Sequence, residues 1–465
     1  MSEEALAGTF EERAHLQLQV PGLATAIGRA MDTILGNRAL AFAGADLEAM
    51  REAGEAIRTH TVASLPAYLE RFAETARANG TNVFFAETGS EAVEYVRGVL
   101  RAHEARLVVK GKSMAAEEIG LNHALEADGT EVVETDLGEY IVQVAHEPPS
   151  HIIVPAVHKT RGQIRDLFNR VHGTDLPDEP ERITKFARQH LRERFLAADV
   201  GITGVNFAIA EAGSFVIVTN EGNGRMCSSL PHVHIAIMGM ERIVPSYREL
   251  AVLMPLLTGS ATGQRVTTYM NFVHGPRRPQ DPDGPEEVHV VVLDNGRSSI
   301  LEGEFRSILH CIRCGACQNV CPVYRQVGGH AYGAVYGGPI GAVLTPLLSG
   351  LERFGDLPNA SSLCAACTDV CPVRIPLHDH LLELRRAVVL ERAGVAERET
   401  FGLWSRAWSR AAGYRLFARL ARVGQWPLAR AHRIRRGPLW LSRWTRDRDL
   451  PAVAARTFRE RRRRS

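Results

Sequence analysis

Lysine is scarce in this chain of 465 residues. It occurs only at Lys110, Lys112, Lys159 and Lys185, so arginine supplies almost all of the positive charge. The totals nearly cancel, with 55 Lys and Arg residues against 53 Asp and Glu residues. Acidic residues are in turn rare from residue 401 onward, where 18 arginines stand beside three acids. An acidic body therefore carries a basic end, and an acidic partner or a membrane surface would be met at that end.

Long apolar runs are missing from the sequence. The longest, such as Ala251–Leu257, fall far short of the ~20 residues that a membrane-spanning helix needs. The start, MSEEALAGTF, is acidic and lacks the apolar stretch of a secretory signal. We therefore expect a cytoplasmic protein, in which cysteines act as metal ligands or catalytic groups more often than as disulfides.

Nucleotide-binding signatures are also missing. No G-x-G-x-x-G follows an expected strand, and neither a Walker motif nor a paired-cysteine CCG repeat occurs. We therefore expect no flavin or nicotinamide site in this chain, and any two-electron acceptor would belong to another subunit.

Short apolar runs rich in β-branched residues alternate with stretches of helical length, such as Ser90–His103 and Met114–Ala127. Strands that alternate with helices of about 10–15 residues predict a parallel sheet covered by helices. The expected strands are Asn82–Ala86, Arg106–Val109, Thr130–Glu134, His151–Pro155, Ser214–Thr219, His232–Met238 and Val288–Leu293.

Four regions follow from these patterns. We expect residues 1–65 to be helical and residues 66–298 to form an open-sheet α/β domain, which ends beyond the Pro- and Gly-rich loop Gly275–Glu286. We expect residues 299–390 to form an α-helical ferredoxin module with two clusters. Residues 391–465 would be a helical C-terminal tail rich in Arg and Trp.

Seven of the eight cysteines fall between residues 311 and 371, in two similar groups. The first group, CIRCGACQNVCP, has the spacing C-x2-C-x2-C-x3-C-P, and SSLCAACTDVCP repeats it 50 residues later without the first cysteine. In two-cluster ferredoxins, three close thiolates hold one iron–sulphur cube and the fourth, before proline, ligates the other. Cluster 1 is therefore expected on Cys311, Cys314, Cys317 and Cys371, and cluster 2 on Cys321, Cys364 and Cys367. Zinc is the alternative that CxxC pairs permit, and the full motif with its near-copy disfavours zinc.

Cluster 2 lacks one expected ligand, because Ser361 stands at the first position of the second repeat. Ser361 itself, a water, or a ligand from another domain such as Cys227 would fill that corner, and a [3Fe–4S] cluster would not need one. Cys227 is more simply interpreted as a small buried residue, and His310 as a residue flanking Cys311. We therefore expect [4Fe–4S] for cluster 1 and [4Fe–4S] or [3Fe–4S] for cluster 2.

Three pairs of polar residues in the α/β domain are further candidates. Lys110 and Lys112 follow an expected strand at the start of a helix, where an anion would bind, or else they lie on a solvated turn. Glu211 and Glu221 flank a strand and are candidates for acid–base or nucleophilic catalysis, with cap or turn acids as the alternative. His232 and His234 share one face of a strand without a third metal ligand, so we interpret them as structural.

The tail contains a basic amphipathic helix, in which apolar residues from Trp404 to Val423 recur every three or four positions with arginines opposite. Such a helix would dock on the chain's own ferredoxin module, on a partner subunit, or on the inner face of the membrane. We expect no nucleic-acid partner. The five tryptophans of the chain all lie in this region, at Trp404, Trp408, Trp426, Trp440 and Trp444.

Three long stretches, Val108–Leu125, Gly201–Ser246 and Cys311–Leu348, resemble the lactate-utilisation protein B family, and the likeness extends over nearly the whole chain. That family comprises iron–sulphur subunits of a bacterial L-lactate oxidation system. The resemblance implies a lactate-utilisation domain similar to sugar-phosphate isomerases and CoA transferases, and it implies that the seven cysteines are cluster ligands. The missing cysteine at Ser361 fits that family's own pattern.

The function implied by the resemblance is electron transfer in the oxidation of L-lactate to pyruvate, beside companion lactate-utilisation subunits. The chain would then be a non-catalytic component of an L-lactate dehydrogenase complex. Two alternatives remain open from the sequence. One is the iron–sulphur subunit of another 2-hydroxy-acid oxidase, of the glycolate type. The other is a transferase- or isomerase-like α/β enzyme with accessory clusters.

Overall fold

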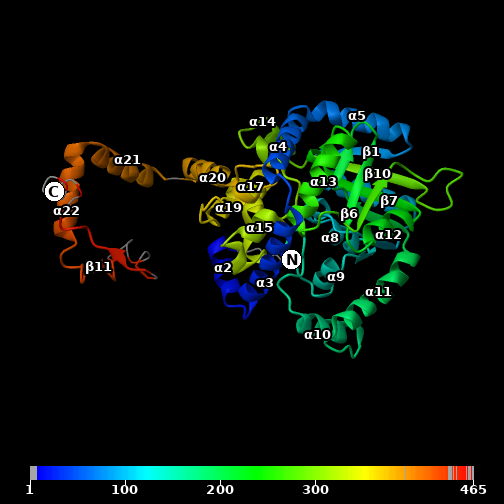
Figure 1. Ribbon diagram of the computed structural model, residues 1–465, viewed down its shortest axis with the longest axis horizontal. Helices are drawn as coiled ribbons and strands as arrows, with labels where there is room; N and C mark the ends of the chain where they lie inside the picture. Colours follow the sequence, from blue (N-terminus) through cyan, green and yellow to red (C-terminus); the bar gives the residue numbers. More distant parts are fainter. Residues whose placement is uncertain are drawn as a thin grey trace. The chain divides into compact units, whose positions relative to one another are not determined.

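The computed structural model describes residues 8–392, 394–437, 442, 445–446, 448–456, 458 and 462. The chain divides after Ala387 into two compact units, and the first of these contains both the main sheet and the cysteine repeats. Figure 1 shows the two parts of the first unit, with the strands on one side and the yellow cysteine-rich segment on the other.

A six-stranded parallel sheet forms the centre of the first part, with the strand order β1-β10-β7-β4-β2-β3. Because all neighbouring strands are parallel, their carboxyl ends meet at one edge, which is where open α/β sheets bind ligands. The strands are β1 (Asn82–Ala86), β2 (Leu107–Lys110), β3 (Glu131–Glu134), β4 (Val200–Gly204), β7 (Val233–Gly239) and β10 (Glu287–Leu293).

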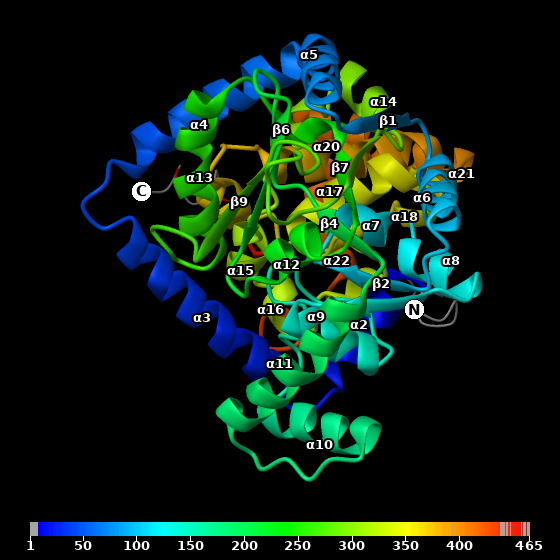
Figure 2. The same ribbon diagram turned by 90° about the vertical axis from the view of Figure 1, so that its right-hand side faces the viewer.

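Helices cover both faces of this sheet (Figure 2). Along β2, Val108 packs in the core beneath α6 and α8, while Leu107 and Val109 pack in the opposite core with α9, α10 and α11. This alternation follows from the two-residue period of a strand and explains the continuous apolar runs of the sequence. The covering helices are α5 (Leu65–Ala78), α6 (Gly89–Ala102), α7 (Met114–Glu118), α8 (Leu121–Ala127), α9 (Leu137–Val144), α10 (Arg161–His172), α11 (Pro180–Ala197) and α12 (Asn223–Ser229).

A smaller sheet of order β8-β5-β6-β9 lies between the main sheet and the rest of the unit. One of its faces contributes Phe215 and Ile217 to a core shared with the main sheet, and the other contributes Phe207 and Val216 to the core of the cysteine-rich part. The elements are β5 (Phe207–Ile209), β6 (Ser214–Thr219), β8 (Ile243–Val244), α13 (Tyr247–Ala261) and β9 (Tyr269–Val273).

The N-terminal helices pack on the cysteine-rich segment, although some 300 residues separate them in the sequence. Ile27 and Met31 are fully buried in one core with Tyr324 and Leu344. Arg13 donates to the carbonyl oxygen of Ala331, which fixes this packing with a buried hydrogen bond. The helices concerned are α2 (Phe10–Leu18), α3 (Leu23–Ala41), α4 (Leu47–Ala63), α14 (Arg297–Glu302), α15 (Ala316–Val320), α16 (Tyr324–Val327), α17 (Gly338–Ser349), α18 (Leu351–Phe354) and α19 (Ala366–Val370).

The chain continues through α20 (Leu377–Arg392) into the second unit, which holds helices α21 (Val395–Ser409) and α22 (Ala411–Gly424). A short antiparallel pair follows, β11 (Arg433–Ile434) with β12 (Leu450–Pro451). Trp440 and Trp444 lie outside the described residues. In the described ranges, no helix combines the length and apolarity that crossing a membrane requires.

Three expected elements differ from the structure. His151–Pro155 is an irregular turn instead of a strand, because His151 Nδ1 accepts the N–H groups of Ile153 and Val154 at 3.0 and 3.2 Å. The helix expected over Met114–Ala127 is broken into α7 and α8 at Gly120, which has a φ of 64°. Ser214–Thr219 is a strand, β6, but it belongs to the smaller sheet.

Strand β4 was not expected, since its sequence VGITG contains two glycines. Gly201 lies so close to helix α12 that a Cβ there would come within 1.8 Å of the Cys227 carbonyl oxygen. A glycine inside a strand often marks such a close backbone approach. The residue that weakened the strand pattern is therefore the one that lets the helix pack on the sheet.

Candidate functional site

The two cysteine repeats adopt the same backbone. Helices α15 and α19 stand 50 residues apart, as the cysteines do, and pack against each other. In the first repeat Arg313 and Gly315 have left-handed φ angles of 59° and 73°, and in the second Leu363 and Ala365 have 55° and 65°. These turns fold each C-x2-C-x2-C run around one point, as three ligands of one cluster require.

The four cysteines expected to hold cluster 1 line one small apolar cavity. Cys311, Cys314, Cys317 and Cys371 surround it together with Ile152 and other aliphatic side chains. Burial and the charges of the neighbouring thiols raise the pKa of Cys317, and these neighbours include all three other cysteines of the cavity. Four sulphur donors around one apolar cavity fit an iron–sulphur cube.

The other three cysteines form a second group. Burial and the charge of nearby Cys364 raise the pKa of Cys321, and burial and the charge of Cys321 raise the pKa of Cys367 to about 11. Cys321 and Cys367 are buried, and Cys364 is exposed. The Tyr332 hydroxyl is buried beside Cys321. Cys311, Cys314, Cys317 and Cys371 thus share one cavity, Cys321 lies near Cys364 and Cys367, and the charge of Cys367 also acts on Cys317.

Among the described residues, no three His, Cys, Asp or Glu side chains come close enough together to hold a single metal ion.

Backbone N–H groups and arginines point at the first cysteine group. The Arg313 N–H donates to Cys311 Sγ at 3.4 Å, and the Ile375 N–H donates to Cys371 Sγ at 3.4 Å, and both contacts would stabilise thiolates. Buried positive charge near the sulphurs offsets the negative charge that a thiolate-held cluster brings. The arginines whose charges act on these cysteines are Arg38, Arg51, Arg58, Arg242 and Arg313.

The residues considered for the open corner of cluster 2 have other partners. The Ser361 hydroxyl accepts the N–H of Leu363 at 3.1 Å. Cys227 lies in the core beneath β2, 3.4 Å from Thr135 Oγ1, where burial raises its pKa to about 12. His310 is buried beside Cys311, and its carbonyl oxygen accepts from Arg58.

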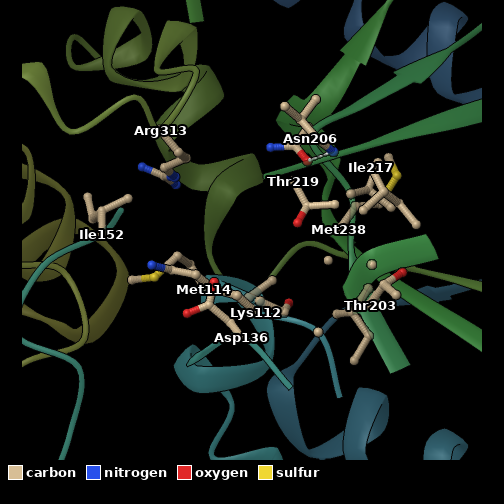
Figure 3. Close-up of a pocket in the computed structure, with 18 of the residues that line it drawn as sticks. Lys112, Met114, Asp136, Ile152, Thr203, Asn206, Ile217, Thr219, Met238 and Arg313 are labelled. Carbon is tan, nitrogen blue, oxygen red and sulfur yellow. Dashed lines mark hydrogen bonds between the residues drawn. The ribbon is translucent and has the colours of Figure 1, made fainter. Parts of the chain in front are cut away.

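A cavity with a volume of about 340 Å³ lies at the carboxyl edge of β2, β4 and β7. Lys112, Thr203 and Met238 come from these strands or directly after them (Figure 3). Figure 3 shows Arg313 and Ile152 on the opposite side, and both residues also line the cluster 1 cavity. The pocket and the first cysteine group therefore share a wall.

Of the two candidate glutamates, Glu221 lines this pocket and Glu211 does not. Glu221 is accessible from the rim, and its Oε2 accepts the Leu137 N–H at 2.9 Å. Desolvation of its carboxylate and the negative charge of the adjacent Asp136 raise the pKa of Glu221 to about 7. Glu211 caps α13 by accepting the N–H of Tyr247, which agrees with the alternative of a structural acid.

The two lysines also separate. Lys110 is fully buried and forms ion pairs with Glu117 and Glu134 at 3.0 and 2.5 Å, so it is structural. Lys112 lines the pocket, and its Nζ lies 3.7 Å from Glu139 Oε1. In the described part of the chain, neither of these two atoms has a hydrogen-bond partner.

The two histidines do not come together. His234 is buried and contacts Thr203 Oγ1 at 2.8 Å, while His232 is exposed and lies 3.5 Å from Glu286. Both therefore agree with the structural interpretation.

Sequence reasoning missed Arg313, Asp136 and Tyr336 as pocket residues. Asp136 follows a predicted strand, β3, and its position after that strand was an available signal. Arg313 and Tyr336 come from the cysteine-rich segment, and no sequence pattern indicates that this segment reaches the sheet edge.

Comparison with known protein families agrees with both halves of this arrangement. Residues 69–293 match the LUD domain family, and residues 307–375 match the 4Fe-4S dicluster domain family. The open parallel sheet and the doubled cysteine repeat thus define an iron–sulphur protein of the LUD class.

Individual relatives narrow the assignment. Lactate utilization protein B of Bacillus cereus (strain B4264) is 51% identical over 415 residues, which are 89% of this chain and 88% of that protein. The proteins of the same name from Bacillus cytotoxicus and Bacillus thuringiensis match with the same identity and coverage. The chain belongs to the lactate utilization protein B family, which confirms the resemblance seen in its sequence.

A crystal structure of a DUF162 family protein from Deinococcus radiodurans was also compared. It is 15% identical, and the match covers 50% of this chain and 98% of that one. Its TM-score of 0.28 does not establish a shared fold.

Proposed function

We propose that this chain is the iron–sulphur electron-transfer subunit of a system that oxidises L-lactate to pyruvate. The observation that carries the proposal is the division of seven cysteines into a set of four and a set of three. The family, whose members are named for lactate utilization, supports the choice of substrate.

The ligand assignment follows the two sets. Cluster 1, a [4Fe–4S] cluster, is held by Cys311, Cys314, Cys317 and Cys371. Cluster 2, either [4Fe–4S] or [3Fe–4S], is held by Cys321, Cys364 and Cys367. When bound, such clusters accept and release single electrons at potentials tuned by their surroundings. This chain provides the thiolate ligands of the clusters, the backbone N–H groups that donate to them, and the nearby arginine charges.

The remaining parts of the proposal concern partners and domains. Lactate oxidation releases two electrons, so companion lactate-utilisation subunits would provide the two-electron acceptor. The protein would be cytoplasmic, with its basic tail (391–465) available for contact with a membrane or the respiratory chain. The α/β domain (66–298), similar to isomerases and CoA transferases, would follow a helical segment (1–65) and precede the cluster module (299–390).

Cysteine substitutions test the ligand assignment directly. In protein purified without oxygen, Cys314→Ser should lose the iron and sulphide of one cluster while the α/β domain stays folded by circular dichroism. Cys227→Ser is the matched control, because this cysteine lies away from both sets and should retain both clusters. Full iron content in Cys314→Ser would contradict the assignment.

A further inference from the structure

The cavity at the carboxyl edge of β2, β4 and β7 has the features of a ligand site. Its volume of about 340 Å³ lies within the range usual for small-molecule sites. Met114, Ile217 and Met238 give it apolar surface, while Thr203 and Asn206 add small polar groups. The electron-transfer role proposed above does not use any of these residues.

Arg313 is held rigidly at one wall of the pocket. Only 6% of its surface is exposed, and its Nη2 donates to Glu241 Oε1 at 3.0 Å. Its guanidinium stacks over the Tyr336 ring, 4.6 Å from the ring centre. Its Nη1 is buried and has no hydrogen-bond partner within the described ranges. A fixed guanidinium with an unused donor suits a carboxylate.

Arg313 differs from the other two arginines of this wall. Arg297 is paired with the carboxylates of Glu118 and Glu241, and Arg242 donates to the carbonyl oxygen of Cys311. Arg313 has one ionic partner, Glu241, and its Nη1 has no hydrogen-bond partner within the described residues. A bound carboxylate would therefore meet the wall at Arg313 Nη1.

The opposite rim of the pocket can exchange a proton. Glu221 lies beside Asp136, and its pKa of about 7 makes it both a hydrogen-bond donor and an acceptor near neutral pH. Burial and the nearby Glu134 raise the pKa of Glu139 to about 8, which leaves Lys112 without an ionised partner in Glu139 at neutral pH. This rim can therefore meet either a hydroxyl or a carbonyl oxygen.

We infer that this pocket binds a small 2-hydroxy or 2-oxo carboxylic acid, with the carboxylate at Arg313 and the second oxygen facing Glu221 and Lys112. The inference rests on the proposed function, and it places substrate or product binding on this chain beside cluster 1. Because Arg313 lies between Cys311 and Cys314 in the sequence, a bound anion would also lower the reduction potential of cluster 1.

Calorimetric titration of the anaerobically purified full-length protein tests the inference. L-lactate and pyruvate are the probes, and inorganic phosphate is the probe for a general anion site. We expect saturable binding of the two acids, weakened about 10- to 100-fold in Lys112→Gln and in Arg313→Gln, the range for losing a charged hydrogen bond. Lys159→Gln is the matched control, since Lys159 pairs with Glu147 outside the pocket.

The outcomes separate this inference from the proposed function. Binding of neither acid by protein with both clusters intact would overturn the inference alone, and would leave the arginines as charge partners of cluster 1 only. Equal binding of phosphate, or unchanged affinity in Lys112→Gln with full iron content, would also overturn it. If Arg313→Gln loses iron, the affinity of Lys112→Gln for the two acids decides the test, because Lys112 does not lie in either cysteine repeat.

Discussion

At the scale of single residues, charge and backbone conformation explain the cysteine site. Arg51 Nε donates to the carbonyl oxygen of Cys371 at 2.9 Å, and its charge acts on that thiol. Gly315 has a φ of 73°, and a Cβ there would come within 3.1 Å of His151 Cε1. The first feature bears on reduction potential, and the second on stability.

Replacing Arg51 should lower the reduction potential of cluster 1. A nearby positive charge favours the more negative, reduced state, so Arg51→Gln removes part of that preference. Redox titration followed by electron paramagnetic resonance would measure the shift, and iron analysis would confirm that both clusters remain. Arg165→Gln, at a surface pair with Asp166, should leave the potential unchanged. A potential in Arg51→Gln equal to that of the parent protein would contradict this.

Gly315→Ala should destabilise the protein by about 1–2 kcal/mol, because a non-glycine residue pays that much in the left-handed region. Gly98→Ala is the opposite case, since this glycine lies inside α6 with open space around its Cβ position. That change should stabilise by about 0.5–1 kcal/mol. Thermal unfolding of both variants checks the prediction, and a stabilised Gly315→Ala would refute it.

At the scale of elements, buried acids at the sheet edge link stability to pH. Glu139 lies in the first turn of α9 and is almost completely buried. Burial and the charge of Glu134 raise its pKa from 4.5 to about 8. Between about pH 4.5 and 8, the folded state therefore holds a proton that the unfolded state has released. Binding of this proton stabilises the fold, and the stabilisation is lost as the pH rises from about 4.5 through 8.

Glu139→Gln should accordingly flatten the pH dependence of stability. The free energy of unfolding of the variant, relative to that of the parent, should be higher at pH 8.5 than at pH 5.5, because an amide carries no charge to bury. Urea unfolding at the two pH values measures the difference. Glu126→Gln, on an exposed face of α8, is the control. An equal effect of Glu139→Gln at both pH values would show that this carboxyl does not titrate as described.

The elements also show what the sequence can predict. Hydrophobic period and β-branched content located β1 and β10 well. In β10 the reason is that a buried parallel strand leaves an unbroken apolar run, whereas β1 is a partly exposed edge strand. The same rule misplaced His151–Pro155, whose apolar side chains pack on the cysteine-rich segment instead of a sheet. The cysteine spacing predicted that both repeats form the same turns, since these turns follow from the motif itself, and the ligand assignment stays a prediction. The pocket could not be predicted, because Arg313 and Lys112 come together only in the tertiary fold.

At the scale of the whole molecule, the cysteine site depends on helices far away in the sequence. Met31 of α3 is fully buried in the core that holds Cys314, Cys317 and Cys321. Asp32 of the same helix forms an ion pair with Arg325, directly after the first repeat. The N-terminal helices therefore support the cluster module.

Met31→Ala should cost about 2–5 kcal/mol, the usual range for truncating a buried methionine. It should also reduce the iron retained after purification, because the lost contacts support the cysteine loops. Leu40→Ala lies on the same helix at an exposed position and should change neither quantity. Normal stability and full iron in Met31→Ala would show that α3 does not support the site.

The central claim is that this chain passes electrons derived from L-lactate and depends on companion subunits to do so. The most direct measurement follows the visible absorbance of the clusters in anaerobic protein, with L-lactate added in the presence or absence of the companion lactate-utilisation subunits. We predict bleaching only when L-lactate and the companions are both present. Bleaching by L-lactate alone would contradict the account, as would clusters that dithionite reduces but the complete mixture does not.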